Sequence, residues 1–264
     1  MRIGTGILSG LLATLLACAA LFLPNTLRAD QVVVRHTEGL AHGFLMLQTL
    51  GGKTIADGQM IQVAQGDRVK QHLTFRFKDG SIYEQTTVFS QRGRFRLLSD
   101  HVVQKGPSFK FPIETSINAS TGQVTICYTE DGKTKVLNER LELPPDIANG
   151  MIFTLIKHIQ PNVPRTTVSI LAATPKPRLV KLAIIPQGNE PFSIGNFQHK
   201  AMHYVVKVEI GGVTGLLAAL FGKQPPDSDI WGLEGEAPAF VKYEGPLYMG
   251  GPIWRIQLAS AGIF

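Results

Sequence analysis

Cysteine is scarce in this sequence. The 264 residues include two, Cys18 and Cys127, and Cys18 lies within an apolar N-terminal segment. A chain cut after that segment keeps Cys127 alone, so it can form no intramolecular disulfide and offers no pair of thiolates to a metal. The fold must therefore be held by its hydrophobic core, for which 44% hydrophobic residues are ample.

Runs of positive charge are also absent. The formal net charge of +6 falls to +4 if Arg2 and Arg28 are removed, and no five consecutive residues are basic. Nucleic-acid binding and polybasic membrane attachment both need clustered lysine and arginine. The charge pattern therefore argues against both kinds of partner.

The sequence lacks the motifs of nucleotide binding and nucleophilic catalysis. Gly222-Lys223 follows glycines and an apolar run, but Gln224 stands where a phosphate loop needs serine or threonine, and Leu217 where it needs glycine. No Gly-x-Ser-x-Gly elbow and no Ser-x-x-Lys occurs. We therefore expect neither a nucleotide site nor an activated serine.

A metal-binding motif is missing although histidine is present. His199 and His203 are four residues apart, the spacing of a zinc pair on a helix. The following Tyr204 to Val208 predicts an extended chain, in which the two would be roughly 13 Å apart. No His-Glu-x-x-His occurs. We expect no metal site and no cofactor.

Two pairs of carboxylates at alternate positions are the remaining candidates for catalysis. Asp227 with Asp229, and Glu234 with Glu236, could bind calcium or divide acid and base roles. Both pairs lie among glycine, proline or serine, where solvated loop acids are the commoner explanation. A hydrolase is thus the least favoured interpretation, and we expect a protein that is not an enzyme.

The N-terminus has the pattern of an export signal. Arg2 precedes an uncharged stretch from Gly4 to Leu23, and the small Ala29 follows. We expect cleavage after Ala29, a signal peptide of residues 1–29, and a location in the periplasm or outside the cell. An uncleaved membrane anchor remains an alternative because the stretch is long enough to span a bilayer. Lipid modification of Cys18 is another.

Turn residues recur at intervals of about one strand plus one turn from residue 51 onward, which predicts consecutive antiparallel strands. The turn glycines are Gly52, Gly66, Gly80, Gly93, Gly106, Gly122 and Gly132. Strands are predicted at Asp30–Arg35, Gly43–Leu50, Val69–Phe77, Ile82–Phe89, Phe95–Val103, Phe109–Ile117, Val124–Thr129, Thr134–Leu141, Thr166–Ala173, Leu179–Ile185, His203–Ile210, Ala237–Tyr243 and Ile253–Ala259.

Two helices are predicted. Asp146 is a suitable N-cap for Ile147–Ile159, which carries an apolar stripe around much of its circumference and ends before Pro161. The second, Val213–Phe221, is short. We predict a mainly β protein with one domain from residue 30 to 264. In it an antiparallel meander forms a curved half-barrel packed on one central apolar helix, with a short second helix.

Several stretches resemble a family of exported bacterial proteins of unknown function: Leu143 to Met151, Gly222 to Asp227, Trp231 to Leu247 and Gly250 to Ile256. The order of many strands, a central helix and a closing Trp-bearing hairpin is also similar to the periplasmic lipoprotein-carrier half-barrels. Those carriers shelter acyl chains on a concave apolar face. The likeness implies a fold, and fold alone does not transfer function.

Two functions remain open from the sequence. In the first, the concave sheet binds a lipid or another hydrophobic molecule, through residues we predict as Met151, Phe153, Leu155, Leu216, Leu217, Phe221 and Trp231. In the second, the same apolar residues fill a solid core, and the protein is an envelope scaffold. It would then bind another envelope protein through an exposed strand edge or the surface between Tyr243 and Trp254. The presence or absence of a cavity separates the two.

Overall fold

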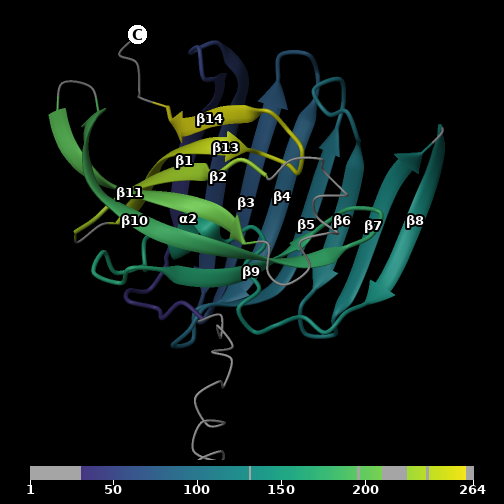
Figure 1. Cartoon of the computed structure of the whole chain (residues 1–264), viewed down its shortest axis with the longest axis horizontal. Coiled ribbons are helices and arrows are strands. Elements are labelled where there is room, and N and C mark those ends of the chain that lie inside the picture. The colour runs from purple at the N-terminus through teal and green to yellow at the C-terminus, as the bar shows by residue number, and fades with distance from the viewer. Residues whose placement is uncertain (1–30, 131, 195–196, 210–224, 236–237, 260–264) are drawn as a thin grey trace, which may run out of the picture.

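The computed structural model describes residues 31–130, 132–194, 197–209, 225–235 and 238–259. The strands form one antiparallel sheet of fourteen (Figure 1). They are β1 (Ala41–Thr49), β2 (Thr54–Gln65), β3 (Arg68–Phe77), β4 (Ile82–Ser90), β5 (Arg96–Lys105), β6 (Ile113–Asn118), β7 (Gln123–Glu130), β8 (Lys133–Arg140), β9 (Thr166–Ala172), β10 (Arg178–Ile194), β11 (Phe197–Glu209), β12 (Ser228–Leu233), β13 (Ala239–Pro246) and β14 (Ile253–Leu258).

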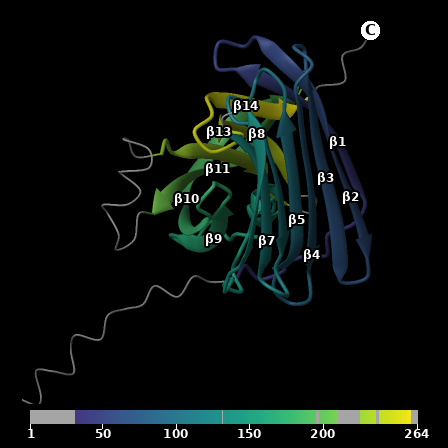
Figure 2. The same cartoon turned by 90° about the vertical axis from the view of Figure 1, so that its right-hand side faces the viewer.

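The sheet consists of two meanders joined in its middle. Strands β1 to β8 form the N-terminal meander and β9 to β14 the C-terminal meander, and β1 pairs with β14 from Leu45↔Leu258 to Thr49↔Trp254. The first and last strands are therefore central, while β8 and β9 are the two edges. Figures 1 and 2 show the C-terminal meander bent across the face of the N-terminal one. The prediction of an unclosed, curved antiparallel sheet is confirmed.

The local patterns that predicted the strands hold in the structure. All seven predicted turn glycines have positive φ, as tight hairpin turns require. On β3, Val69, Leu73, Phe75 and Phe77 are buried on one face, whereas on the other face Lys70 and Arg76 are exposed, His72 is half-buried and Thr74 is buried. Period-two alternation therefore correctly assigns the concave face of this strand.

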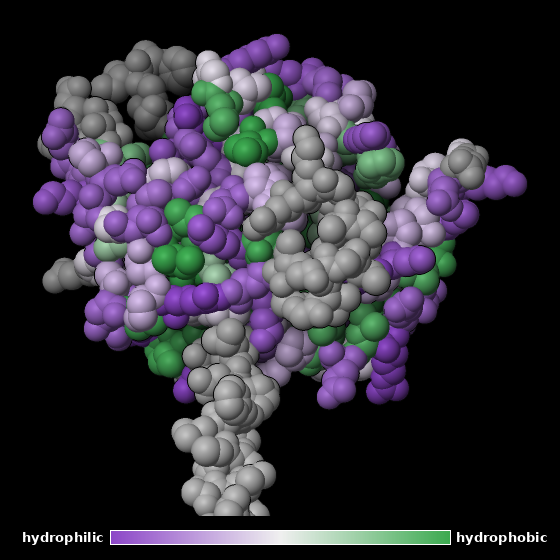
Figure 3. Space-filling view, in the orientation of Figure 1, coloured by the Kyte–Doolittle hydropathy of each residue, from purple (hydrophilic) through white to green (hydrophobic). Residues whose placement is uncertain are grey.

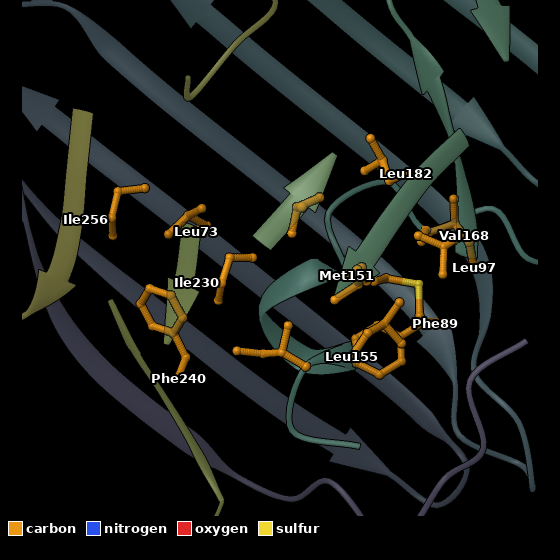
Figure 4. Close-up of a cluster of buried hydrophobic side chains, with 14 of the residues drawn as sticks. Leu73, Phe89, Leu97, Met151, Leu155, Val168, Leu182, Ile230, Phe240 and Ile256 are labelled. Atoms are coloured by element: carbon orange, nitrogen blue, oxygen red, sulfur yellow. The ribbon is translucent and has the colours of Figure 1, made fainter. Parts of the chain in front are cut away.

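The hydrophobic core lies between the two meanders. It takes Phe75 and Phe89 from the N-terminal meander and Ile230 from the C-terminal one. Met151 and Leu155, from the segment that links β8 to β9, project into the same cluster (Figure 4). Both are almost fully buried, so this linking segment is part of the core and not a surface loop.

The predicted helix Ile147–Ile159 is wrong in extent, because only α2 (Ile152–Leu155) is helical. Gly150 has a φ of +69°, which stops a helix from running through it. Before Gly150 the chain instead pairs with β9, where the Ala148 N–H donates to the Ser169 carbonyl over 2.8 Å. Asp146, the predicted N-cap, accepts a hydrogen bond from the Ser169 hydroxyl over 2.7 Å.

Both edges of the sheet are protected against pairing with another chain. The 146–149 segment covers the edge of β9 through main-chain bonds and through the side chain of Asn149, which bonds both backbone groups of Leu171. The edge strand β8 carries exposed Lys133, Lys135 and Glu139. Charged side chains are a usual defence of a free edge.

Some strands differ from their sequence predictions. β2 and β12 were not predicted, because inward positions on them hold residues that break the apolar alternation. On β2 these are Gly58, which leaves room for the ring of Phe75, and Gln62, which is buried and hydrogen-bonded. The predicted strand Asp30–Arg35 is also wrong over its described part, where only an isolated bridge between Val33 and Arg94 forms.

The predicted helix Val213–Phe221 and the export segment of residues 1–29 lie outside the described residues. Within the described ranges, no helix has the length and hydrophobicity to cross a bilayer.

Gly150 is expected to tolerate no side chain, because it is packed against β4 and β5. An alanine Cβ there would overlap the Thr87 hydroxyl and lie 2.7 Å from Asp100 Oδ1, whereas at Gly52, also at positive φ, it would meet no atom within 4 Å. Gly150→Ala should therefore lower the free energy of unfolding by at least about 2 kcal/mol more than Gly52→Ala. Urea unfolding measures both, and equal losses would contradict the packing argument.

Candidate functional site

A cavity of about 520 Å³ lies between the two meanders. Leu73 from β3 forms part of one wall, and Ile170, Val180, Leu182, Val206, Val208 and Ile230 from strands β9 to β12 form the opposite one. The rim is marked by exposed Pro226, Met249 and Gly250. The volume falls within the range of about 300–1,000 Å³ that is usual for small-molecule sites.

Phe153 and the hairpin between β13 and β14 complete the lining. The Phe153 ring stacks on Phe240 at 4.3 Å between centroids and contacts Tyr243 at 5.5 Å. Leu247 and Tyr248 of the hairpin also face the cavity, and the Tyr248 hydroxyl donates to the Ser108 carbonyl over 3.2 Å. These contacts fix aromatic rings on the cavity wall without filling the space.

The floor of the cavity is polar. Gln71, Tyr83 and Gln85 occupy inward positions on the neighbouring strands β3 and β4. The Tyr83 hydroxyl donates to Gln85 Oε1 over 3.2 Å, and Gln85 Nε2 donates to Asp100 Oδ1 over 3.0 Å. Gln71 Nε2 donates to the Gly150 carbonyl over 3.1 Å. A chain of hydrogen bonds thus leads from the cavity to Asp100.

Asp100 is a buried carboxylate that is bonded by neutral groups. It is 2% exposed, and its other hydrogen bond comes from the Thr87 hydroxyl at 2.7 Å. Within the described residues, no lysine, arginine or histidine forms an ion pair with it. Burial is the dominant influence and raises the pKa of Asp100 to about 6, although the bonds from Thr87 and Gln85 lower it.

The tyrosines of the cavity stay neutral at physiological pH. Burial raises the pKa of Tyr243 to about 12 and raises the pKa values of Tyr83 and Tyr248 above the ordinary tyrosine value. Their hydroxyls therefore serve as hydrogen-bonding groups, and none of them is a source of negative charge inside the cavity.

A second cluster, His36, Glu38 and His158, has ligand atoms close enough to hold a metal ion. Glu38 is 4% exposed and accepts bonds from Lys157 Nζ at 2.6 Å and His158 Nε2 at 2.8 Å. Gln62 Nε2 donates to it as well, over 2.7 Å. Glu38 thereby joins the N-terminal segment to β2 and to the segment after α2.

The donor set of this cluster does not fit a metal ion. The Arg35 N–H donates to His158 Nδ1 over 3.1 Å, so the ring proton must be on Nε2, the atom that would have to bind the metal. The Lys157 ammonium already neutralises the carboxylate. We interpret the cluster as a structural ion pair.

A third group of ionisable residues lies outside the cavity lining, on β10 to β12. His203 Nδ1 is 2.9 Å from Glu190 Oε1 and His203 Nε2 is 2.7 Å from Asp229 Oδ1. Trp231 stacks on the His203 ring at 4.5 Å, and its indole N–H donates to Glu190 over 2.8 Å. Lys242 Nζ lies 3.5 Å from the Trp231 ring centroid. No hydroxyl or thiol nucleophile is part of this group.

The predicted site residues fall in different places. Phe153 lines the cavity, whereas Met151 and Leu155 are buried in the core beside it. Trp231 packs away from the cavity, with Ala201 and Val241. The other three predicted residues, Leu216, Leu217 and Phe221, lie outside the described residues.

The two predicted carboxylate pairs do not form paired acids in the described residues. Asp229 faces His203, whereas Asp227 lies 3.4 Å from Lys207, and Glu236 is outside the described residues. His199 and His203 both lie on strand β11, so the predicted extended chain is confirmed. The polar floor was missed, although polar residues at inward positions of β3 and β4 could have revealed it.

Comparison of this chain with protein-family models, with curated proteins and with solved structures gives no match. The predicted likeness to exported bacterial proteins stays a prediction. The function must be inferred from the cavity and the side chains around it.

Replacing Glu38 by glutamine is expected to lower the free energy of unfolding by about 3 kcal/mol at neutral pH, because Lys157 would lose its buried partner. Burial alone would raise the pKa of Glu38, but the hydrogen bond from His158 and the charge of Lys157 lower it to about 2. The stabilisation is therefore full above about pH 5 and is lost as the pH falls towards 2. Unfolding in urea across this range measures it.

The exposed Glu114 offers a control for Glu38. Glu114→Gln removes an acid 3.6 Å from His101 near the surface and should change stability by no more than about 0.5 kcal/mol. A Glu38→Gln protein as stable as Glu114→Gln at pH 7 would show that the buried ion pair contributes nothing.

The effect of Asp100→Asn on stability should vary with pH in the opposite sense to that of Glu38→Gln. The raised pKa of Asp100, about 6, means that the native protein loses stability as the pH rises from about 4 to 7 and the buried group becomes charged. Relative to the unaltered protein, Asp100→Asn should therefore gain about 3 kcal/mol across this range. Thermal unfolding against pH measures the difference, with exposed Asp67→Asn as control, and parallel curves would refute it.

Proposed function

We propose that this protein is a non-enzymatic binding protein that holds a lipid or other hydrophobic molecule between the two meanders. The observation that carries the proposal is the cavity of about 520 Å³, whose walls are apolar on both sides. A solid core would leave no such space, since protein interiors are normally close-packed.

The size and lining of the cavity suit an apolar chain. Burying one methylene contributes about 0.8 kcal/mol, so eight buried methylenes would contribute about 6 kcal/mol before the entropy of immobilising the ligand is subtracted. Walls from β9 to β12 supply mostly branched aliphatic side chains, and Phe153 adds an aromatic surface. The strength of such apolar contacts depends on the area they bury. The cavity can therefore accept related hydrophobic molecules.

The side chains around the cavity support a binding role over catalysis. Its described lining holds no cysteine, histidine, carboxylate or lysine that could serve as nucleophile or general base. Ser228 is the one serine or threonine among these residues, and its oxygen lies 3.3 Å from the hydroxyl of Tyr243, which is not a base. Cys127 lies on β7 and is not part of this lining.

The alternative of an interaction surface between Tyr243 and Trp254 receives less support. Tyr243, Leu247 and Tyr248 form part of the cavity wall, so their side chains face the interior and not a partner. On the face seen in Figure 3, the coloured hydrophobic residues lie in separate groups among hydrophilic ones. A partner-binding site is usually a larger continuous apolar patch.

Export fits this function as a further part of the proposal. A water-insoluble molecule needs a protein shelter to cross the aqueous periplasm or the medium. Neither the export signal nor the alternative of an uncleaved anchor bears on the cavity, which lies wholly within the sheet domain. Native mass spectrometry of protein purified from its own cells would identify a ligand that remains bound.

The binding function predicts that filling the cavity removes binding. The neutral dye N-phenyl-1-naphthylamine should fluoresce on addition of the protein, and Val208→Trp should weaken its binding at least about tenfold by occupying the space the dye needs. Val208 lines the cavity, whereas its neighbour Lys207 is exposed. Lys207→Trp is the matched control and should bind as the unaltered protein does.

Circular dichroism and thermal unfolding would establish that both variants are folded. If the unaltered protein does not bind the dye, or if Val208→Trp and Lys207→Trp bind it equally well, the cavity is not a binding site and the proposed function is wrong.

A further inference from the structure

The described part of the cavity lining offers no charged group to a ligand. Among the described residues that line it there is no lysine, arginine, histidine, aspartate or glutamate. An ionised head group taken into such a space would lose its hydration without gaining a counter-ion, which costs several kcal/mol. The chemistry of the lining therefore restricts the kind of molecule that can enter completely.

The polar floor can still bind a neutral group. Gln85 Oε1 accepts one bond, from Tyr83, and a carbonyl oxygen can accept two. The Tyr83 oxygen can accept a bond while it donates its own proton, and Gln71 Nε2 uses one of its two protons on the Gly150 carbonyl. The floor thus presents both acceptors and a donor, which a hydroxyl group satisfies because it both donates and accepts.

Asp100 disfavours the binding of an anion at the floor. Its carboxylate lies directly behind Gln85, at hydrogen-bond distance from the Gln85 amide. The negative charge of Asp100 would repel a carboxylate or phosphate bound at the floor, and because Asp100 is buried, solvent screens this charge little.

Asp100 is also poorly placed to bind a cation directly. Thr87 and Gln85 already donate to its oxygens, and Gly150 lies over them, with its Cβ position only 2.7 Å from Oδ1. An ammonium group at the floor would therefore meet amides and hydroxyls but no carboxylate, and it would lose the hydration that a charged group requires.

From these contacts we propose that the cavity selects an uncharged amphiphile, whose hydroxyl end binds Gln71, Tyr83 and Gln85 at the floor and whose apolar part lies between the meanders. This inference rests on the proposed binding function and specifies its ligand class, a long-chain or isoprenoid-like alcohol. It excludes free fatty acids and phospholipid head groups from the floor.

Three ligands with the same ten-carbon chain test the head group: 1-decanol, decanoate and decylammonium. Each is titrated against the protein loaded with N-phenyl-1-naphthylamine at pH 7.5, and displacement of the dye is followed by fluorescence. Decanol is expected to displace the dye at a concentration at least about tenfold lower than either charged ligand, because only decanol can be buried without losing the hydration of a charge.

Variants connect the selectivity to the floor. Gln71→Leu should weaken decanol binding several-fold, because the free amide donor is lost, whereas Gln59→Leu on β2 is the matched control. Gln59 faces the opposite side of the sheet, where it bonds His42, and its replacement should change nothing. Asp100→Asn should improve the binding of decanoate relative to that of decanol several-fold, because it removes the negative charge behind the floor.

The outcomes separate this inference from the function on which it rests. If the dye binds and decanoate competes as well as decanol, the head group remains at the rim in water, and the inference is wrong while the binding function stands. Tightest binding of decylammonium, abolished in Asp100→Asn, would overturn it in favour of a cationic ligand. If the dye does not bind at all, the binding function itself fails. Selectivity measured on the unaltered protein alone decides the matter should Gln71→Leu not fold.

Discussion

The pairing of β1 with β14 is the contact on which the architecture depends. It brings the first and last strands of the sheet together over the register from Leu45↔Leu258 to Thr49↔Trp254, and joins two meanders that are otherwise each built from neighbouring strands. Without it the two would share no ladder. Because it places the first and last strands in the middle of the sheet, the strands from the middle of the sequence become the edges, and the 141–165 segment must cross the concave face between them.

That crossing segment determines whether the interior is solid or hollow. Gly150 touches the polar residues of β3 to β5, Phe153 stacks on β13, and the Ile159 carbonyl accepts a bond from Tyr204 on β11. A helix through the whole segment would fill more of the space between the meanders. Residues 146–149 cover the edge of β9, and only the residues after them form the short α2. Space therefore remains beside this segment, and the cavity occupies it.

Much of the sheet could be predicted because its signals are local. Positive-φ glycines and period-two alternation reflect interactions within one hairpin, and they located most of the strands. The candidate site could be predicted only in part. Phe153 was identified from its place in an apolar segment, but Gln71 and Gln85 gain their roles from Gly150 and Asp100, which are distant in sequence. Trp231 was predicted to bind the ligand but packs with Ala201 and Val241, and its local sequence does not show which face of β12 it occupies.

The sequence alone therefore determined a mainly antiparallel β protein with a large apolar interior, since hydrophobic content, turn chemistry and alternation are properties of neighbouring residues. The tertiary structure decided the rest. It set which strands meet in the middle, it stopped the apolar segment 147–159 from becoming a long helix, and it placed a polar floor beneath an apolar cavity. Each of these outcomes depends on contacts between residues far apart in the chain, and these can outweigh local propensity when a buried backbone needs a partner.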